Sequence, residues 1–447
     1  MNQNTFIELL FDRAKAAGFS AFEAYLRQGS SFEVAVNAGE LTRYNVADSL
    51  NLGFRGLYNG RMGCASTQAL DADAAEMLVN AAKAGAELCE SEDEEFIFEG
   101  SPSYPEFDGS HPEIERIGAA EKIEMVKALE QKTLDFDPRV SSVDDCALFI
   151  SARDVTLVNS RGLRLHTHRD SMGAYVGAIA RNGERTGTAG RDSVVGDPVK
   201  LDLDKLAREA AGEAVAFLDA GSVASGSYPI LLRPDMAARL TATFASLFSA
   251  DAAQKGLSLL KGREGETIAA PCVTIVDDPL LPDGFASYAF DGEGVAARRK
   301  SVVEGGTLQT LLHNLKTARK QGVETTGNAA RISAAGPMSV SPSNFYLLPG
   351  AAGVDELYAR AGDAILITDL MGMHSGANAV SGDFSLGAKG FLVRNGRLDR
   401  AVNQITIAGN FLELLREIEA VGSDLTFGAS HFASPTILVR ALSVAGK

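Results

Sequence analysis

The sequence predicts an α+β protein, in which an N-terminal α/β layered region of sheet and helices precedes a large β-rich C-terminal domain. Two observations lead to this prediction. Apolar residues recur at helical spacing in four segments of the first half of the chain, 5–18, 71–88, 113–134 and 203–218. Short apolar runs separated by Gly, Asn and Asp occur along the whole chain, which is typical of strands joined by turns.

Length and composition indicate a folded chain of two or three domains. The chain has 447 residues, and a domain usually takes roughly 100 to 200. Hydrophobic residues make up 45% and charged residues 22%, as in globular proteins. The net charge of -16 argues against a protein whose main task is to neutralise phosphates. Direct binding to nucleic acid is therefore not expected.

Cysteine usage and the N-terminal segment favour a cytoplasmic protein. The four cysteines lie far apart and form no Cys-x-x-Cys pair, which is typical of reduced thiols. The first 18 residues are amphipathic and contain charges, unlike a signal peptide, and no run of about 18 apolar residues occurs. No membrane partner is expected.

Residues 1–105 are predicted to form the N-terminal α/β domain. Thr5 and Glu8 form a capping-box pattern, so a first helix should start there and end near residue 18. A second helix, capped by Asp71 or Asp73, should end near residue 88. Strands are expected at 22–26, 32–36, 52–57 and 62–66.

Residues 106–222 are predicted to form a central α/β segment. A boundary before it is indicated by the acidic run 90–95 and by three prolines within 102–112, because these residues fit neither a helix interior nor a central strand. The expected elements are a helix over 113–134, two strands within 140–159, strands over 163–168 and 172–181, and a helix over 203–218. The small-residue segment 220–227 marks the second boundary.

Residues 223–447 are predicted to form the β-rich C-terminal domain. A strand at 229–232 begins it, and a helical stripe follows that is expected to be core: Met236, Leu240, Phe244, Leu247 and Phe248. Further strands are expected at 273–276, 302–303, 308–312 and 405–410, with a last helix through about residue 420.

The stretch 364–396 is the main candidate for a functional surface. Strand-like runs at 364–367 and 390–393 enclose a loop rich in Gly, Ser, Asn and Asp. Loops held by rigid strands often carry binding sites, although an ordinary long β-loop is the alternative interpretation. The candidate residues are Asp369, Gly372, His374, Gly376, Ser381, Gly382 and Asp383.

The residues show no familiar catalytic motif. No histidine is followed by glutamate, which excludes the His-Glu helix of zinc proteases. His166 and His168 should share one strand face, as metal ligands or as exposed side chains. His374, with Asp369 and Asp383 near it in sequence, is either a base or a metal ligand, or a loop histidine at the surface. The segment 382–389 lacks the spacing of a phosphate loop.

Several short motifs in order resemble the TldD/PmbA family, which includes proteins described as modulators of DNA gyrase and cytosolic metalloproteases working as TldD/TldE complexes. The resemblance covers nearly the whole chain. The matching stretches are 276–278, 290–295, 306–308, 326–328, 346–350, 381–385, 407–410 and 421–424.

The resemblance also indicates a branch of the family. The TldD branch has a His-Glu-x-x-x-His zinc helix and a cysteine ligand near the C-terminus. Here Thr241 and Ala242 stand at the first His and the Glu, Ser246 at the second His, and Ala433-Ser434 near the cysteine. The chain is therefore similar to the TldE (PmbA) branch, with no catalytic residue and no cofactor of its own.

The resemblance implies a subunit that pairs with a zinc-bearing TldD-like partner in a protease for unfolded peptides, as a hetero- or homodimer. The glycine-rich candidates would then line a groove that takes peptide by strand addition. Two alternatives stay open. One is an independent metal-dependent peptidase that uses His374, Asp369 and Asp383 or the His166 pair, and the other is a non-proteolytic modulator of DNA gyrase.

Overall fold

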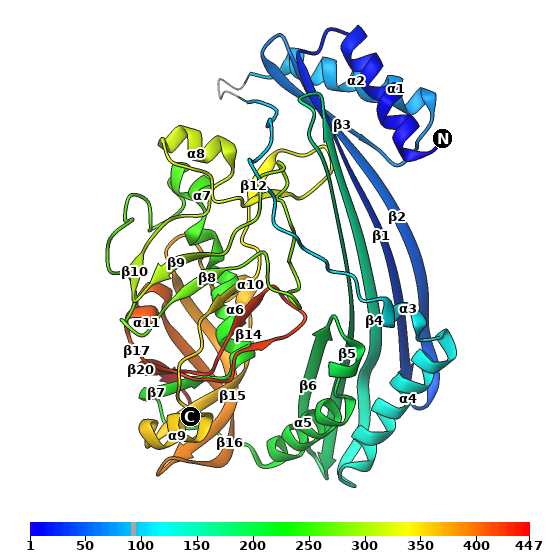
Figure 1. Ribbon diagram of the computed structural model, residues 1–447. Helices are drawn as coiled ribbons and strands as arrows, with labels where there is room; N and C mark the ends of the chain where they lie inside the picture. Colours follow the sequence, from blue (N-terminus) through cyan, green and yellow to red (C-terminus); the bar gives the residue numbers. More distant parts are fainter. Residues whose placement is uncertain (91–94) are drawn as a thin grey trace.

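The computed structural model describes residues 1–90 and 95–447 and confirms the α+β architecture (Figure 1). One long antiparallel sheet forms the first part of the molecule, and two six-stranded sheets form most of the second. Residues 91–94 of the predicted acidic boundary lie outside the described residues. No helix in the described ranges has the length and apolar character needed to cross a membrane.

The N-terminal sheet has the strand order β3-β2-β1-β4-β5-β6. Since β1 pairs with β4 from Glu23 to Val36, the segments predicted as first and central domains share one sheet. Its strands are β1 (Ala21–Asn37), β2 (Glu40–Tyr58), β3 (Arg61–Thr67), β4 (Val140–Asn159), β5 (Arg164–Asn182) and β6 (Arg185–Val195).

These strands are longer than predicted. The runs 22–26 and 32–36 both belong to β1, the two strands expected within 140–159 are one strand, and 163–168 and 172–181 are joined in β5. Polar residues in mid-strand interrupt the apolar pattern, but the hydrogen-bonded ladder continues through them. Apolar periodicity therefore identified only the apolar parts of β1, β4 and β5 and not the polar residues that join them.

The helices of this part cover one face of the sheet. Phe22 and Leu26 of β1 pack with α1 (Gln3–Ala16) and α2 (Ala72–Leu88). Val34 and Val36 pack with α4 (Ala119–Asp135) and α5 (Leu203–Ala216). All four β1 residues have even numbers, so they point to the same side of the strand.

Two helix starts differ from the predictions. Asn2 Oδ1 accepts the backbone N–H of Thr5 at 2.9 Å, so Asn2 caps α1 and Thr5 already lies inside it. The helix expected over 113–134 is divided at Gly118 into α3 (Pro112–Arg116) and α4. Asp71 caps α2, as one of the two predicted candidates.

The C-terminal part contains sheets of order β16-β15-β14-β7-β20-β17 and β10-β9-β8-β13-β19-β18. Helix α6 (Pro234–Phe244) contacts strands of both sheets, and all five residues of the predicted helical stripe are buried. The helix itself ends at Phe244 and a 3₁₀ turn, Ala245–Phe248, carries the rest of the stripe.

The elements that matter for the site are β7 (Gly226–Leu232), α6 (Pro234–Phe244), β14 (Ala364–Met371), α10 (Met373–Gly376), β15 (Asp383–Arg394), β16 (Arg397–Asn410), β18 (Thr426–Phe427) and β19 (Phe432–Ser434). The others are α7 (Ala250–Gln254), β8 (Ile275–Asp277), β9 (Lys300–Glu304), β10 (Thr307–Leu308), α8 (Leu315–Gln321), β11 (Ala329–Arg331), β12 (Met338–Val340), β13 (Phe345–Leu347), α9 (Val354–Ala361), α11 (Phe411–Arg416), β17 (Ile418–Val421) and β20 (Ile437–Ala445).

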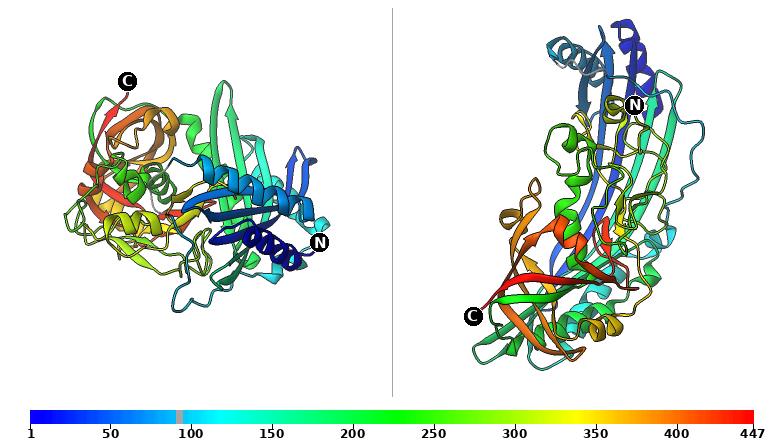
Figure 2. Two further views of the ribbon diagram at one scale, coloured as in Figure 1. Left: turned by 90° about the horizontal axis from the view of Figure 1, so that it is seen from above. Right: turned by 90° about the vertical axis from the view of Figure 1, so that its left-hand side faces the viewer.

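The C-terminal part lies beside the N-terminal sheet, on the side opposite to α1, α2 and α4 (Figures 1 and 2). Odd-numbered residues of β1 face it. Arg331 of β11 forms an ion pair with Glu23 and lies over the ring of Tyr25. The sheet therefore has a helix-covered outer face and an inner face directed at the C-terminal part.

Candidate functional site

A cleft of about 1140 Å³ opens where the N-terminal sheet meets the C-terminal part. Strand β6 and helix α5 contribute to one side, α6, β14 and β15 to the other, and the segment 426–432 completes the lining. Strand β6 is the last strand of its sheet. An edge strand presents backbone groups without ladder partners, so this cleft is suited to an extended chain.

Helix α6 carries two of the predicted zinc-motif positions, Thr241 and Ala242. Pro234 at its first turn suits a helix start, and the helix then buries Met236, Leu240 and Phe244. Ala242 lines the cleft. Thr241 is buried, and its Oγ1 donates to the carbonyl oxygen of Ala237 at 2.9 Å.

The remaining motif positions are equally unsuited to a metal. Ser246 is exposed in the 3₁₀ turn, and Ser434 is buried with its Oγ donating to the carbonyl oxygen of Pro435 at 2.8 Å. Zinc takes imidazole, thiolate or carboxylate ligands, and methyl and hydroxyl groups do not replace them. Within the described ranges, no three or more His, Cys, Asp or Glu are grouped to hold a metal ion. These positions do not fit zinc.

A charge network joins the two parts of the molecule at the cleft. Glu213 of α5 accepts a hydrogen bond from Arg233 Nη1 at 2.7 Å and pairs with Arg191 of β6. Arg233 also donates to the carbonyl oxygen of Thr368 at 2.6 Å and pairs with Asp235. Burial acts to raise the pKa of Glu213, but the charges of Arg233 and Arg191 outweigh it and hold that pKa below its ordinary value.

We expect Glu213→Gln to lower the free energy of unfolding by about 1–3 kcal/mol at neutral pH, since a buried charge-assisted pair is lost. A carboxyl with a depressed folded pKa stabilises the protein above its unfolded pKa, near 4.5, and loses that effect as pH falls through the folded value. The free energies of unfolding of the wild type and of Glu213→Gln, measured in urea, should therefore become equal in acid. Glu209→Gln, a more exposed position on the same helix, should change stability by less than about 0.5 kcal/mol, and equal losses would contradict the prediction.

Of the seven candidates in the glycine-rich stretch, only Asp369 lines the cleft. Its carboxylate lies 3.5 Å from Arg239 Nη1 and 3.5 Å from Lys389 Nζ. His374 is exposed in α10, and Gly372 precedes α10 with φ +81°. Asp369 and Asp383 therefore contact different groups, and among the described residues His374 forms no hydrogen bond or ion pair with either.

The other candidates support the loop that closes between α10 and β15. Asn410 Nδ2 donates to Ser381 O and to Asp383 Oδ1, both at 2.9 Å. This hydrogen bond lowers the pKa of Asp383. Gly382 has φ +80°, and a side chain at Gly376 would meet the carbonyl oxygen of Ser385. Their role as groove residues stays a prediction.

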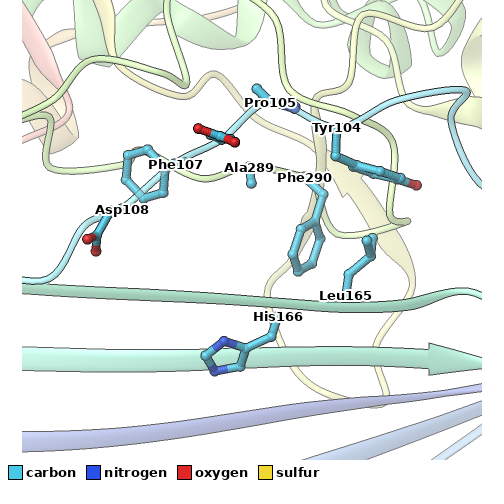
Figure 3. Close-up of a pocket in the computed structure, with 9 residues that line it drawn as sticks. Tyr104, Pro105, Phe107, Asp108, Leu165, His166, Ala289 and Phe290 are labelled. Atoms are coloured by element: carbon cyan, nitrogen blue, oxygen red, sulfur yellow. The ribbon is translucent and has the colours of Figure 1, made fainter.

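His166 and His168 lie on one face of β5, and both contact Asp154 Oδ1, at 3.2 and 3.0 Å. Burial would lower the pKa of His168, but hydrogen bonds and charges of Asp154 and Asp170 raise it overall. His166 also lines a second pocket of about 420 Å³, between the segment 104–108 and the loop at Ala289 and Phe290 (Figure 3). This pocket is separate from the cleft.

Sequence reasoning missed the network of Glu213, Arg191 and Arg233. A signal for part of it exists, because Arg233 and Asp235 stand directly after the apolar strand 229–232. Nothing in the sequence pairs them with Glu213, which lies on the polar side of an amphipathic helix like many solvated glutamates.

Comparison with known proteins places all three segments of the chain in one family. Models of the PmbA/TldA metallopeptidase match as domain 1 over residues 22–86, as the central domain over 112–218 and as the C-terminal domain over 225–446. These ranges cover the N-terminal sheet, the cleft and both C-terminal sheets.

Individual relatives agree. A Haemophilus influenzae protein called metalloprotease PmbA homolog is 27% identical over 98% of this chain and 95% of its own. A Methanothermobacter thermautotrophicus metalloprotease is 32% identical over 61% of this chain, which spans 60% of that relative's length. The crystal structure of a candidate modulator of a DNA gyrase from Thermotoga maritima superposes with TM-score 0.92 at 34% identity, covering 99% of this chain and 100% of the other. This chain belongs to the TldD/PmbA metallopeptidase family.

Proposed function

We propose that this chain is a TldE/PmbA-like subunit of a cytoplasmic TldD/TldE-type metalloprotease that acts on unfolded peptides. In this role it binds peptide and assembles as a dimer with a TldD-like catalytic subunit, which supplies the zinc. One observation carries the proposal: the chain has a cleft suited to an extended peptide, and Thr241, Ala242 and Ser246 stand at the positions that the family resemblance assigns to the zinc ligands and the base.

The edge strand supports the peptide-binding role. Residues 189–193 of β6 line the cleft, and β6 has a sheet neighbour on one side only. Strand addition recognises the backbone of any extended chain, which suits unfolded substrates of varied sequence. Aromatic side chains of Phe149, Tyr175 and Phe432 offer contacts for apolar side chains of such a peptide.

Co-purification with a TldD-like partner followed by metal analysis of each subunit tests this function. We expect zinc in the partner only, peptide cleavage by the pair, and no cleavage by this chain alone. Stoichiometric metal in the lone chain, or cleavage by it, would refute a non-catalytic role.

Ala242→Trp should weaken peptide binding at least tenfold, because the indole would occupy the cleft beside α6. Fluorescence anisotropy with a dye-labelled unstructured peptide measures this effect on the isolated chain. Ser246→Trp is the matched control, since Ser246 is exposed and lies outside the lining. If both variants bind as the wild type does, the cleft is not the peptide site.

A modulator of DNA gyrase is the second candidate function, favoured by the description of the Thermotoga maritima relative. The net charge of -16 disfavours contact with DNA, so such an effect would act through the gyrase protein. A supercoiling assay with the pure chain tests it, and unchanged supercoiling would dismiss it.

A further inference from the structure

Three arginines lie together on the inner face of the N-terminal sheet. Arg153 of β4 is directly opposite Arg169 of β5 in the ladder. Arg27 of β1 is opposite Val155, two positions along β4 from Arg153. Since side chains two residues apart share a face, the three guanidinium groups project to the same side. We call this set the arginine cluster.

No acidic side chain in the described part of the chain forms an ion pair with the arginine cluster. Across the described ranges, Arg27, Arg153 and Arg169 have no carboxylate within ion-pair distance. The acids next to them in sequence, Asp154 and Asp170, point to the outer face and contact His166, His168 and His111. Like charges placed opposite each other destabilise a sheet, so this arrangement favours a bound anion.

The surroundings of the arginine cluster also favour a bound anion. Burial and then the charge of Arg153 lower the pKa of Arg169 to about 10, against the opposing charge of Asp170. Arg169 donates to the carbonyl oxygen of Gly284 at 3.3 Å and lies over the ring of Phe285, which orients the guanidinium without neutralising it. The Oγ1 of Thr167 is buried nearby on the same strand face, without a hydrogen-bond partner in the described part of the chain.

The cluster is continuous with the cleft. Phe149 lines the cleft and precedes Arg153 by four residues on the same face of β4, a distance of about 13 Å at 3.3 Å per residue. Between them the floor is made by small residues, Ser151 paired with Ser171 and Gly173 under the ring of Phe149. An extended chain lying in the cleft thus needs about four more residues to reach the arginines.

We infer that the arginine cluster binds a carboxylate of the peptide that lies in the cleft. The cluster would then select peptides that carry a negative group about four residues beyond the segment held in the cleft. This inference rests on the proposed peptide-binding function. Guanidinium groups bind carboxylates through paired, charge-assisted hydrogen bonds, and three of them on a rigid sheet form a fixed receptor. The carboxylate is either the C-terminus or an Asp or Glu side chain.

The test compares Arg153→Gln and Arg27→Gln with the wild type in peptide binding, measured by anisotropy on the full chain. Three dye-labelled forms of one unstructured peptide are used: with a free C-terminus, with an amidated C-terminus, and amidated with an internal aspartate. Wild-type protein should bind at least one acidic form about tenfold more tightly than the neutral amide. Which acidic form gains affinity identifies the source of the carboxylate.

Each variant should lose that gain and bind the neutral amide unchanged, while Arg153→Lys should retain part of it. Arg161→Gln, which removes the same charge from an exposed turn, is the matched control and should bind as the wild type does. If Ala242→Trp abolishes binding but all three peptides bind the wild type equally, the arginine site is refuted and the proposed function stands. If the wild type binds none of the peptides, both are refuted.

Discussion

Arg331→Ala is expected to lower the free energy of unfolding by about 3–5 kcal/mol, because it leaves a buried carboxylate without one of its two partners. Arg331 is 2% exposed and pairs with Glu23, which is 1% exposed. Its Nε also donates to the carbonyl oxygen of Gly292 at 2.8 Å. Arg55 remains 3.0 Å from Glu23 but belongs to the N-terminal sheet, so the link to the C-terminal part is lost.

Urea unfolding followed by circular dichroism measures the loss. Arg298→Ala is the control, since Arg298 forms an exposed pair with Glu324 and should change stability by less than about 0.5 kcal/mol. Burial acts to raise the pKa of Glu23, but Arg55 and Arg331 together lower it. The stabilisation by this pair should therefore be complete above the ordinary glutamate pKa and fade as pH falls through the folded value. If Arg331→Ala lost no more unfolding free energy than Arg298→Ala, the stabilising role of the buried pair would be contradicted.

The sequence was informative where structure is local. Asp71 as a helix cap and the buried stripe over residues 236–248 follow from local spacing in the sequence, and both are confirmed. Mid-strand polar residues hid the length of β1 and β4, and the β1–β4 pairing that continues through them joins residues more than a hundred positions apart. Hydrophobic periodicity identifies which face of a strand is buried, but it does not identify the strand that pairs with it.

The candidate site shows the same limit. The assignment of Thr241, Ala242 and Ser246 to the zinc-motif positions comes from the family resemblance and stays a prediction. The cleft could not be predicted from the sequence, since Glu213 and Arg233, which pair there, come from different parts of the chain. The glycine-rich stretch was predicted as a site from its composition. In the structure, Gly376 allows the close approach of the Ser385 carbonyl and Gly382 adopts a positive φ within the loop.

The family motifs near 276–278 and 326–328 meet in a buried network. Asp277 is fully buried, and its Oδ2 accepts from Lys300 Nζ at 2.7 Å and from Asn328 Nδ2 at 2.9 Å. Its Oδ1 accepts the backbone N–H of Ser343 at 2.6 Å. None of these residues lines the cleft, so the motifs that carry the family resemblance here support the fold.

Lys300→Met should therefore lower the free energy of unfolding by about 3–5 kcal/mol, because the buried carboxylate of Asp277 loses its only cationic partner among the described residues. Lys261→Met, at an exposed position, should stay within about 0.5 kcal/mol of the wild type. Adding Asp277→Asn to Lys300→Met removes the uncompensated charge, so the double variant should lose less than the sum of the single variants in urea unfolding. Additive losses would mean that the two side chains stabilise the fold independently, and the network would then owe its stability to Asn328 and Ser343 alone.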